Sequence, residues 1–153
     1  MSTLKAEQIA VAFYNAINTA GIVASGCVLR SNVYPYHDEA LPGINVILGA
    51  DRPVTETGPD NFTFQDWMLT LYADCVVKQP LSAGDLDTAL NSLRLGVHKA
   101  VMANYTLGLN FVINGYPSEV VEPERKGEGE EQVAVMRTAF TFHYRATITD
   151  PSQ

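Results

Sequence analysis

Two long stretches of alternating apolar and polar residues constrain the fold of this chain more than any other feature. Every odd position from Trp67 to Val77 is apolar, whereas Asp66 and Lys78 are among the even ones. A similar alternation runs through residues 134–148, with most apolar residues at even positions. Because successive side chains of a strand point to opposite faces, both stretches predict long strands with one buried and one wetter face. We expect the second strand to be antiparallel to its neighbours.

Two other segments repeat apolar residues at the helical spacing of three and four. The first follows Ser2 or Thr3, either of which can cap a helix, and ends at Gly21. The second follows Ser82 or Asp85. This spacing predicts two amphipathic helices. The apolar stripes comprise Ala6, Ile9, Ala10, Phe13, Ala16, Ile17 and Ala20 in the first segment, and Leu86, Leu90, Leu93, Val97 and Val101 in the second.

Shorter strands and a long loop are expected between the first helix and the first long strand. Residues 22–36 are rich in β-branched side chains broken by glycine and proline, which favours one or two short strands. Residues 44–48 form a compact apolar run between turn residues, which is typical of a buried strand. Residues 49–63 contain two prolines and two glycines without any period, so they predict a long loop.

The segment after the second helix predicts a hairpin and an acidic loop. Residues 107–113 alternate up to Asn114-Gly115, a pair that favours a two-residue hairpin turn, with residues 116–121 as the return strand. Residues 119–131 contain six glutamates, which predicts a mobile loop. The order of elements indicates a single α+β domain over residues 1–153, with two helices on a mixed or antiparallel sheet.

Composition narrows the classes of function. The chain has 153 residues and a net charge of −7, so it has no general attraction to phosphate backbones or anionic membranes. Cys27 and Cys75 belong to no CxxC pair, so we expect neither a zinc site nor a redox motif, and a reduced cytosolic setting. Residues 9–29 carry no charge, but the polar residues and glycines within them argue against a membrane span.

No spaced constellation of a known catalytic site is present, so we expect no enzyme, no cofactor and no metal. His37-Asp38-Glu39 is the densest polar group, and we interpret it as an exposed turn. His98 lies at the flank of the second apolar stripe, where a histidine is seldom a ligand.

The wetter face of the last strand is the better candidate for an interface. Arg137, His143 and Arg145 share it and could pair with carboxylates of a partner, although an ordinary solvated face is the alternative. Tyr72 is expected on the opposite face of its strand from Trp67, where it could anchor a partner. The candidate interface residues are Arg52, Glu56, Asp60, Tyr72, Glu124, Arg125, Lys126, Glu128, Arg137, His143 and Arg145.

A resemblance follows from the order of these segments. Residues 40–47, ALPGINVI, followed by Gly49-Ala50-Asp51, resemble a strand and loop of tail terminator proteins from long-tailed bacteriophages, of the lambda minor tail protein U type. The resemblance continues through the long strand, a helix opening at Leu86-Asp87, a hairpin, an acidic loop and a last strand containing FTFHYRAT at residues 140–147. It covers nearly the whole chain.

The resemblance implies a structural virion protein that works by recognition. Such a subunit forms a hexameric ring with copies of itself on the head-proximal end of the tail tube, stops tube growth and offers a surface to the head-tail connector. Its partners would be the tail tube protein and the connector, with DNA passing through the ring without sequence-specific binding and no membrane involved. It would reside in the virion tail, and in the host cytoplasm during assembly. Residues 49–63 and 119–131 would become ordered when a neighbouring ring docks.

Three other interpretations remain open from the sequence. Another ring protein of the neck or tail completion would have a related small α+β subunit. A small cytosolic enzyme or ligand-binding domain would use His37, Asp38 and His143. A host intracellular dimer of no viral origin would also fit the composition.

Overall fold

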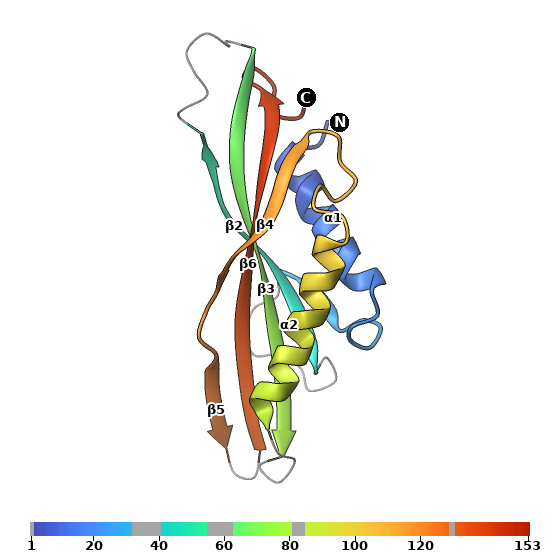
Figure 1. Ribbon diagram of the computed structural model, residues 1–153, viewed down its shortest axis with the longest axis vertical. Coiled ribbons are helices and arrows are strands. Elements are labelled where there is room, and N and C mark those ends of the chain that lie inside the picture. Colours follow the sequence, from blue (N-terminus) through green and yellow to red (C-terminus); the bar gives the residue numbers. More distant parts are fainter. Residues whose placement is uncertain (1, 32–40, 55–62, 81–84, 129–130) are drawn as a thin grey trace.

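A twisted, elongated sheet of six strands carries both helices on one of its faces (Figure 1). The computed structural model describes residues 2–31, 41–54, 63–80, 85–128 and 131–153. This architecture confirms the α+β class. The elements are α1 (Lys5–Thr19), β1 (Val28–Arg30), β2 (Gly43–Pro53), β3 (Phe64–Pro80), α2 (Leu86–Met102), β4 (Val112–Val120), β5 (Glu124–Glu128) and β6 (Glu131–Thr147).

The two predicted long strands, β3 and β6, form the centre of the sheet. They pair antiparallel over their full 17 residues, from Phe64 opposite Thr147 to Pro80 opposite Glu131. On one side β2 pairs antiparallel with β3, and β1 pairs parallel with β2, which makes the sheet mixed. β1 is the short strand expected within residues 22–36, of which residues 32–36 lie outside the described part.

The other side of β6 is covered by two strands in line. β4 pairs with residues 138–144 of β6, and β5 pairs with residues 131–135. The predicted hairpin is therefore wrong, because Asn114 and Gly115 lie inside β4, and the expected return strand continues β4 to Val120 and pairs with β6. A Cβ atom on Gly115 would come within 2.4 Å of the Tyr105 carbonyl oxygen and 2.6 Å of the Phe142 ring. Glycine is needed there for this close approach and not for a turn.

Both predicted loops are shorter than expected. β2 continues to Pro53 after an irregularity between Leu48 and Asp51, so the first residues of the expected loop 49–63 are strand, and residues 55–62 lie outside the described part. The acidic segment 119–131 is mostly strand as well, because the last residues of β4 and all of β5 lie within it. Hydrogen bonding to a long neighbouring strand outweighs the local preference of a charged segment for loops.

The helices bury most of their predicted stripes on the even-numbered face of β6, but Ala16 is only half-buried and Ala20, which follows α1, is exposed. Phe13 of α1 packs edge-on against Phe140 and Phe142, with ring centroids 5.6 Å and 5.9 Å apart. Leu90 and Val97 of α2 are buried in the same core. The residues of this core cluster are apolar, so burial of the helical stripes stabilises the packing of both helices on the sheet.

Of the two predicted helix N-caps, the structure confirms one. Asp85 caps α2 as expected, since its carboxylate accepts hydrogen bonds from the backbone N–H groups of Asp87 and Thr88. The α1 N-cap is Leu4, without a side-chain hydrogen bond, so the expected cap by Ser2 or Thr3 is wrong.

The two termini meet at one end of the molecule (Figure 1). The backbone N–H of Lys5 donates to the Pro151 carbonyl at 3.2 Å, and the Lys5 ammonium donates to the Arg145 carbonyl at 3.0 Å. The start of α1 is therefore fastened to the end of β6.

Candidate assembly surfaces

The face of the sheet opposite the helices is the main candidate surface, and we name it the open face. No described helix lies on it. Its residues alternate with the core residues along β3 and β6, so the parity that builds the core also sets this surface. The open face comprises Asp66, Met68, Thr70, Tyr72 and Asp74 of β3, Arg137, Ala139, Thr141, His143 and Arg145 of β6, and Tyr116 of β4.

A buried carboxylate organises one end of the open face. Asp66 is 4% exposed and accepts two hydrogen bonds from Arg145, from Nε at 2.6 Å and from Nη2 at 3.1 Å. His143 Nε2 lies 3.1 Å from the same carboxylate. The hydrogen bonds from Arg145 lower the pKa of Asp66, burial opposes this, and His143 adds to the lowering. The cluster keeps Asp66 ionised at neutral pH.

A second buried carboxylate lies further along the same strands. Arg137 donates to Asp74 from Nε at 2.7 Å and from Nη2 at 2.8 Å, while Asp74 is 4% exposed. The guanidinium also lies over the Tyr72 ring, 4.8 Å from its centroid. Tyr72 is on the opposite face from Trp67, as expected. These contacts hold the arginine and the ring in fixed positions.

The expected pairing of these cations with a partner needs correction. Arg137 and Arg145 do share one face with His143, but each arginine already binds an aspartate of its own chain. Sequence reasoning missed Asp66 and Asp74 as their partners. Both lie at even positions of β3, on the face that the alternation predicts to be wetter. The register that sets them opposite the arginines, 79 and 63 residues away, cannot be predicted from the local sequence pattern. The open face is therefore close to neutral.

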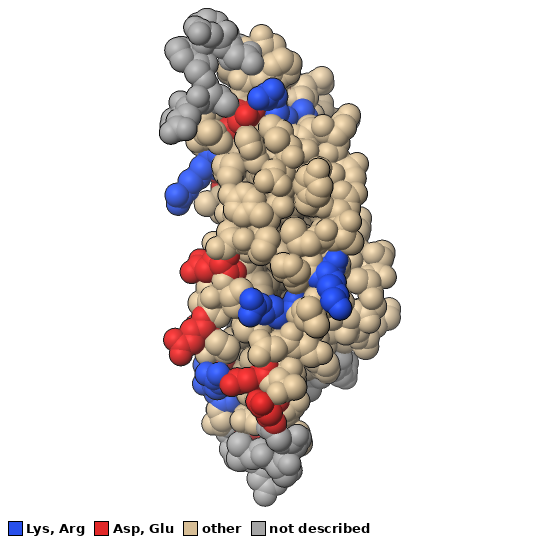
Figure 2. Space-filling view, viewed as in Figure 1, with Lys and Arg blue, Asp and Glu red and all other residues tan. Residues whose placement is uncertain are grey.

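The edge formed by β4 and β5 is chemically different. It exposes Glu119, Glu122 and Glu124, and acidic side chains gather along this edge on the lower left of Figure 2. Arg125 of β5 binds Asp87 of α2 at 2.7 Å, with about half of each side chain exposed. Three of the expected interface residues, Glu124, Arg125 and Lys126, are exposed here, and Glu128 ends β5.

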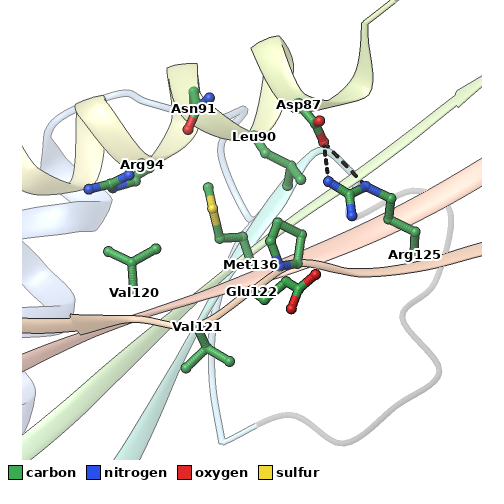
Figure 3. A pocket seen from close by; sticks show the side chains of 10 residues that line it. Asp87, Leu90, Asn91, Arg94, Val120, Val121, Glu122, Arg125 and Met136 are labelled. Carbon is green, nitrogen blue, oxygen red and sulfur yellow. Dashed lines mark hydrogen bonds and ion pairs between the residues drawn. The ribbon is translucent and has the colours of Figure 1, made fainter.

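A shallow hollow of about 300 Å³ opens between α2 and the link from β4 to β5 (Figure 3). Leu90 from the helix and Met136 from β6 point into it, and Asp87 and Arg125 close one end. A second hollow of about 360 Å³ lies on the other side of this link. The lining of the second hollow consists of Asp74, Val121, Glu122, Glu124, Val135 and Arg137. The link thus stands between two cavities, held by a hydrogen bond from the Val121 N–H to the Arg137 carbonyl.

The remaining expected residues divide into two groups. Arg52 is exposed on β2 opposite Met68, which places it beside the open face. Glu56, Asp60 and the segment His37-Asp38-Glu39 lie outside the described residues. His98 is exposed on α2 with its ring 6.3 Å from that of Phe140, which confirms its expected position at the flank of the stripe.

Within the described ranges, no cluster of three or more His, Cys, Asp or Glu side chains has a geometry suited to a metal ion. Nor does any helix in this part of the chain combine the length and apolarity that a membrane span requires. Cys27 and Cys75 are buried free thiols, and burial raises the pKa of Cys75 to about 12, helped by the nearby Asp74 carboxylate.

Comparison with known proteins gives a likeness in structure alone. No family model and no curated protein matches the sequence. A chain from the virion of a native gene transfer agent particle is similar in structure, with a TM-score of 0.51 and 10% sequence identity. The match covers 87% of this chain and 94% of that chain. The fold of this protein is therefore one that a virion component also has.

Proposed function

We propose that this chain is a structural subunit of a phage-like virion, of the tail terminator kind. Six copies would form a ring on the head-proximal end of the tail tube, end its growth and present a surface to the head-tail connector. The observation that carries the proposal is the structural match to a virion chain, because it spans nearly all of both chains and so concerns the whole domain. The order of sequence segments that resembles tail terminators supports the finer assignment.

The physical requirement of such a subunit is a pair of unlike surfaces. Rings of a tube stack by repeating one contact, so growth ends when a ring binds that contact on one side without forming it again on the other. The neutral open face and the acidic β4–β5 edge are unlike surfaces of this type. A tube subunit and a connector subunit could therefore be recognised by separate parts of the same molecule.

The charge of the chain suits a ring around DNA. A net charge of −7 on each copy disfavours adhesion of passing DNA to the ring. The same charge makes association sensitive to salt, because like copies repel each other less when their charges are screened.

Electron microscopy of the purified protein, alone and mixed with tail tube subunits of the same particle, tests the proposal. We expect sixfold rings on one end of the tubes, and tubes that stop growing once capped. Tubes that continue to elongate at the same rate with the protein present would overturn the terminator role. Rings that bind the connector but never the tube would assign the protein to another position in the neck.

A further inference from the structure

The outer face of α2 carries positive charge that no carboxylate of the same chain binds. Arg94 and Lys99 are exposed there, and neither forms an ion pair with another described residue. Leu95 lies beside them and is 54% exposed. By contrast, a carboxylate of the same chain binds each of Arg30, Lys78, Arg125, Arg137 and Arg145. The cations of α2 are therefore available to a partner.

The β4 half of the β4–β5 edge, residues 112–123, has the opposite charge. Its only charged residues are Glu119 and Glu122, which are both exposed and form no ion pair with a described residue. Val121 lies between them and is 40% exposed. Figure 2 shows basic side chains over α2 and acidic ones along this edge. The two surfaces thus carry opposite charges around exposed apolar side chains.

Length and charge limit such a contact to this half of the edge. The 17 residues of α2 extend about 25 Å, whereas residues 112–128 extend about 55 Å as strand. A helix laid along the edge therefore covers about half of it. The β5 half carries Arg125 and Lys126, which would repel the cations of α2. β5 thus stays available to a partner outside the ring.

A second copy of the chain is the occupant that the proposed ring requires. Copies in a ring must touch although each has a net charge of −7, so their contact has to join unlike charges. Arg94 and Glu122 line the same hollow of one copy (Figure 3), but they form no ion pair across it. Both charges can therefore be paired by a neighbour.

We propose that the outer face of α2 of one copy binds the β4 half of the edge of the next copy. Leu95 meets Val121, and the cations of the helix face the carboxylates of the edge. Glu119 lies opposite Ala139 of the open face, whereas α2 covers the other side of the sheet. Surfaces that point in different directions make a head-to-tail contact, which a constant rotation closes into a ring. This contact rests on the proposed ring function and supplies the surfaces that the ring needs.

Reversing the charges of each surface tests the contact. The edge variant combines Glu119→Lys with Glu122→Lys, and the helix variant combines Arg94→Glu with Lys99→Glu. Sedimentation velocity measures self-association of the parent, of each variant and of an equimolar mixture of the two variants, alone and with tail tube subunits. Thermal unfolding first shows that each variant folds as the parent does. Where one does not, substitutions to Gln at the same positions take its place.

We expect each variant alone to associate at least about tenfold more weakly than the parent. The edge variant is the sharper test, because its net charge changes from −7 to −3 and weaker general repulsion alone would strengthen association. The mixture should recover association, since the basic helix of one variant fits the acidic edge of the other, and the acidic helix fits the basic edge. Recovered rings should contain the two variants in equal numbers.

Unchanged rings in both variants would overturn the contact and leave the ring function standing. Stronger association of the edge variant would show that net repulsion governs assembly, which also overturns the contact. A mixture that does not recover would mean that the two surfaces do not bind each other. Parent complexes that stop at two copies would overturn the head-to-tail geometry. A parent protein that stays monomeric both alone and with tubes would overturn the ring function itself.

Discussion

The two faces of the central β3–β6 ladder are built from the same strands but are stabilised in different ways. On the helix-covered face, Leu71 and Phe140 lie opposite each other and shape complementarity stabilises the fold. On the open face, Asp74 lies opposite Arg137, and buried carboxylates are held by arginine side chains. Parity along the strand therefore decides which of the two faces a residue joins. The difference shows that a sheet face without a helix can still be highly ordered.

The largest effect is expected on the helix-covered face. Phe140→Ala should reduce the free energy of unfolding by about 3–5 kcal/mol, because it removes a buried ring that contacts Phe13 and leaves a cavity. Denaturant unfolding measures the loss. Phe64→Ala is the matched control, since that ring is 42% exposed at the start of β3. Similar losses in the two variants would contradict the assigned core.

A smaller effect is expected for the charge pairing on the open face. Arg137→Met should cost about 1–3 kcal/mol, because Asp74 would stay buried without its partner while the exposed part of the arginine moderates the loss. Arg125→Met breaks the exposed pair with Asp87, which water screens on both sides, and should change stability much less than Arg137→Met does. Equal effects in chemical denaturation would show that the open face is no more organised than any solvated surface.

The smallest effect is a change in pH dependence at the Asp66 cluster. The pKa of Asp66 is lowered in the folded protein, so its contribution to stability is present above the unfolded-state pKa of about 3.9 and is lost as the pH falls through the lower folded-state value. Arg145→Gln removes the main cause of the lowering. We expect the stability difference between parent and variant to be full at pH 7 and to shrink below about pH 4, as followed by thermal unfolding. If the stabilities of parent and variant differed by the same amount from pH 7 to pH 2, the lowered pKa of Asp66 would not be the source of the difference.

The sequence predicted the elements whose apolar residues repeat regularly over many consecutive positions. The alternations that became β3 and β6 gave the buried face of both strands correctly, and the helical stripes gave α1 and α2. It failed where pairing overrides local preference, as at Asn114-Gly115 and in the acidic segment that became β5. Turn residues and charges are weak signals when a 17-residue strand offers hydrogen bonds along its whole length.

The sequence predicted which residues share the candidate surface, but not which residues they bind there. Arg137, His143 and Arg145 were placed on one face from parity alone, and the structure agrees. Their bonds to Asp66 and Asp74 depend on strand register, which a single sequence does not specify. Without the strand register, the sequence cannot distinguish arginines that are free to bind carboxylates of a partner from arginines that already bind carboxylates of their own chain.

The meeting of the two chain ends bears on how an assembly of this protein can be imaged. A tag or a gold label attached at either Lys5 or Pro151 would mark the same pole of each copy, because the backbone atoms of these residues are hydrogen bonded to each other. In the proposed ring, labels on opposite ends of the sequence would thus lie at one radius when the ring is seen from above. A side view of such particles would show toward which side of the proposed ring this pole points.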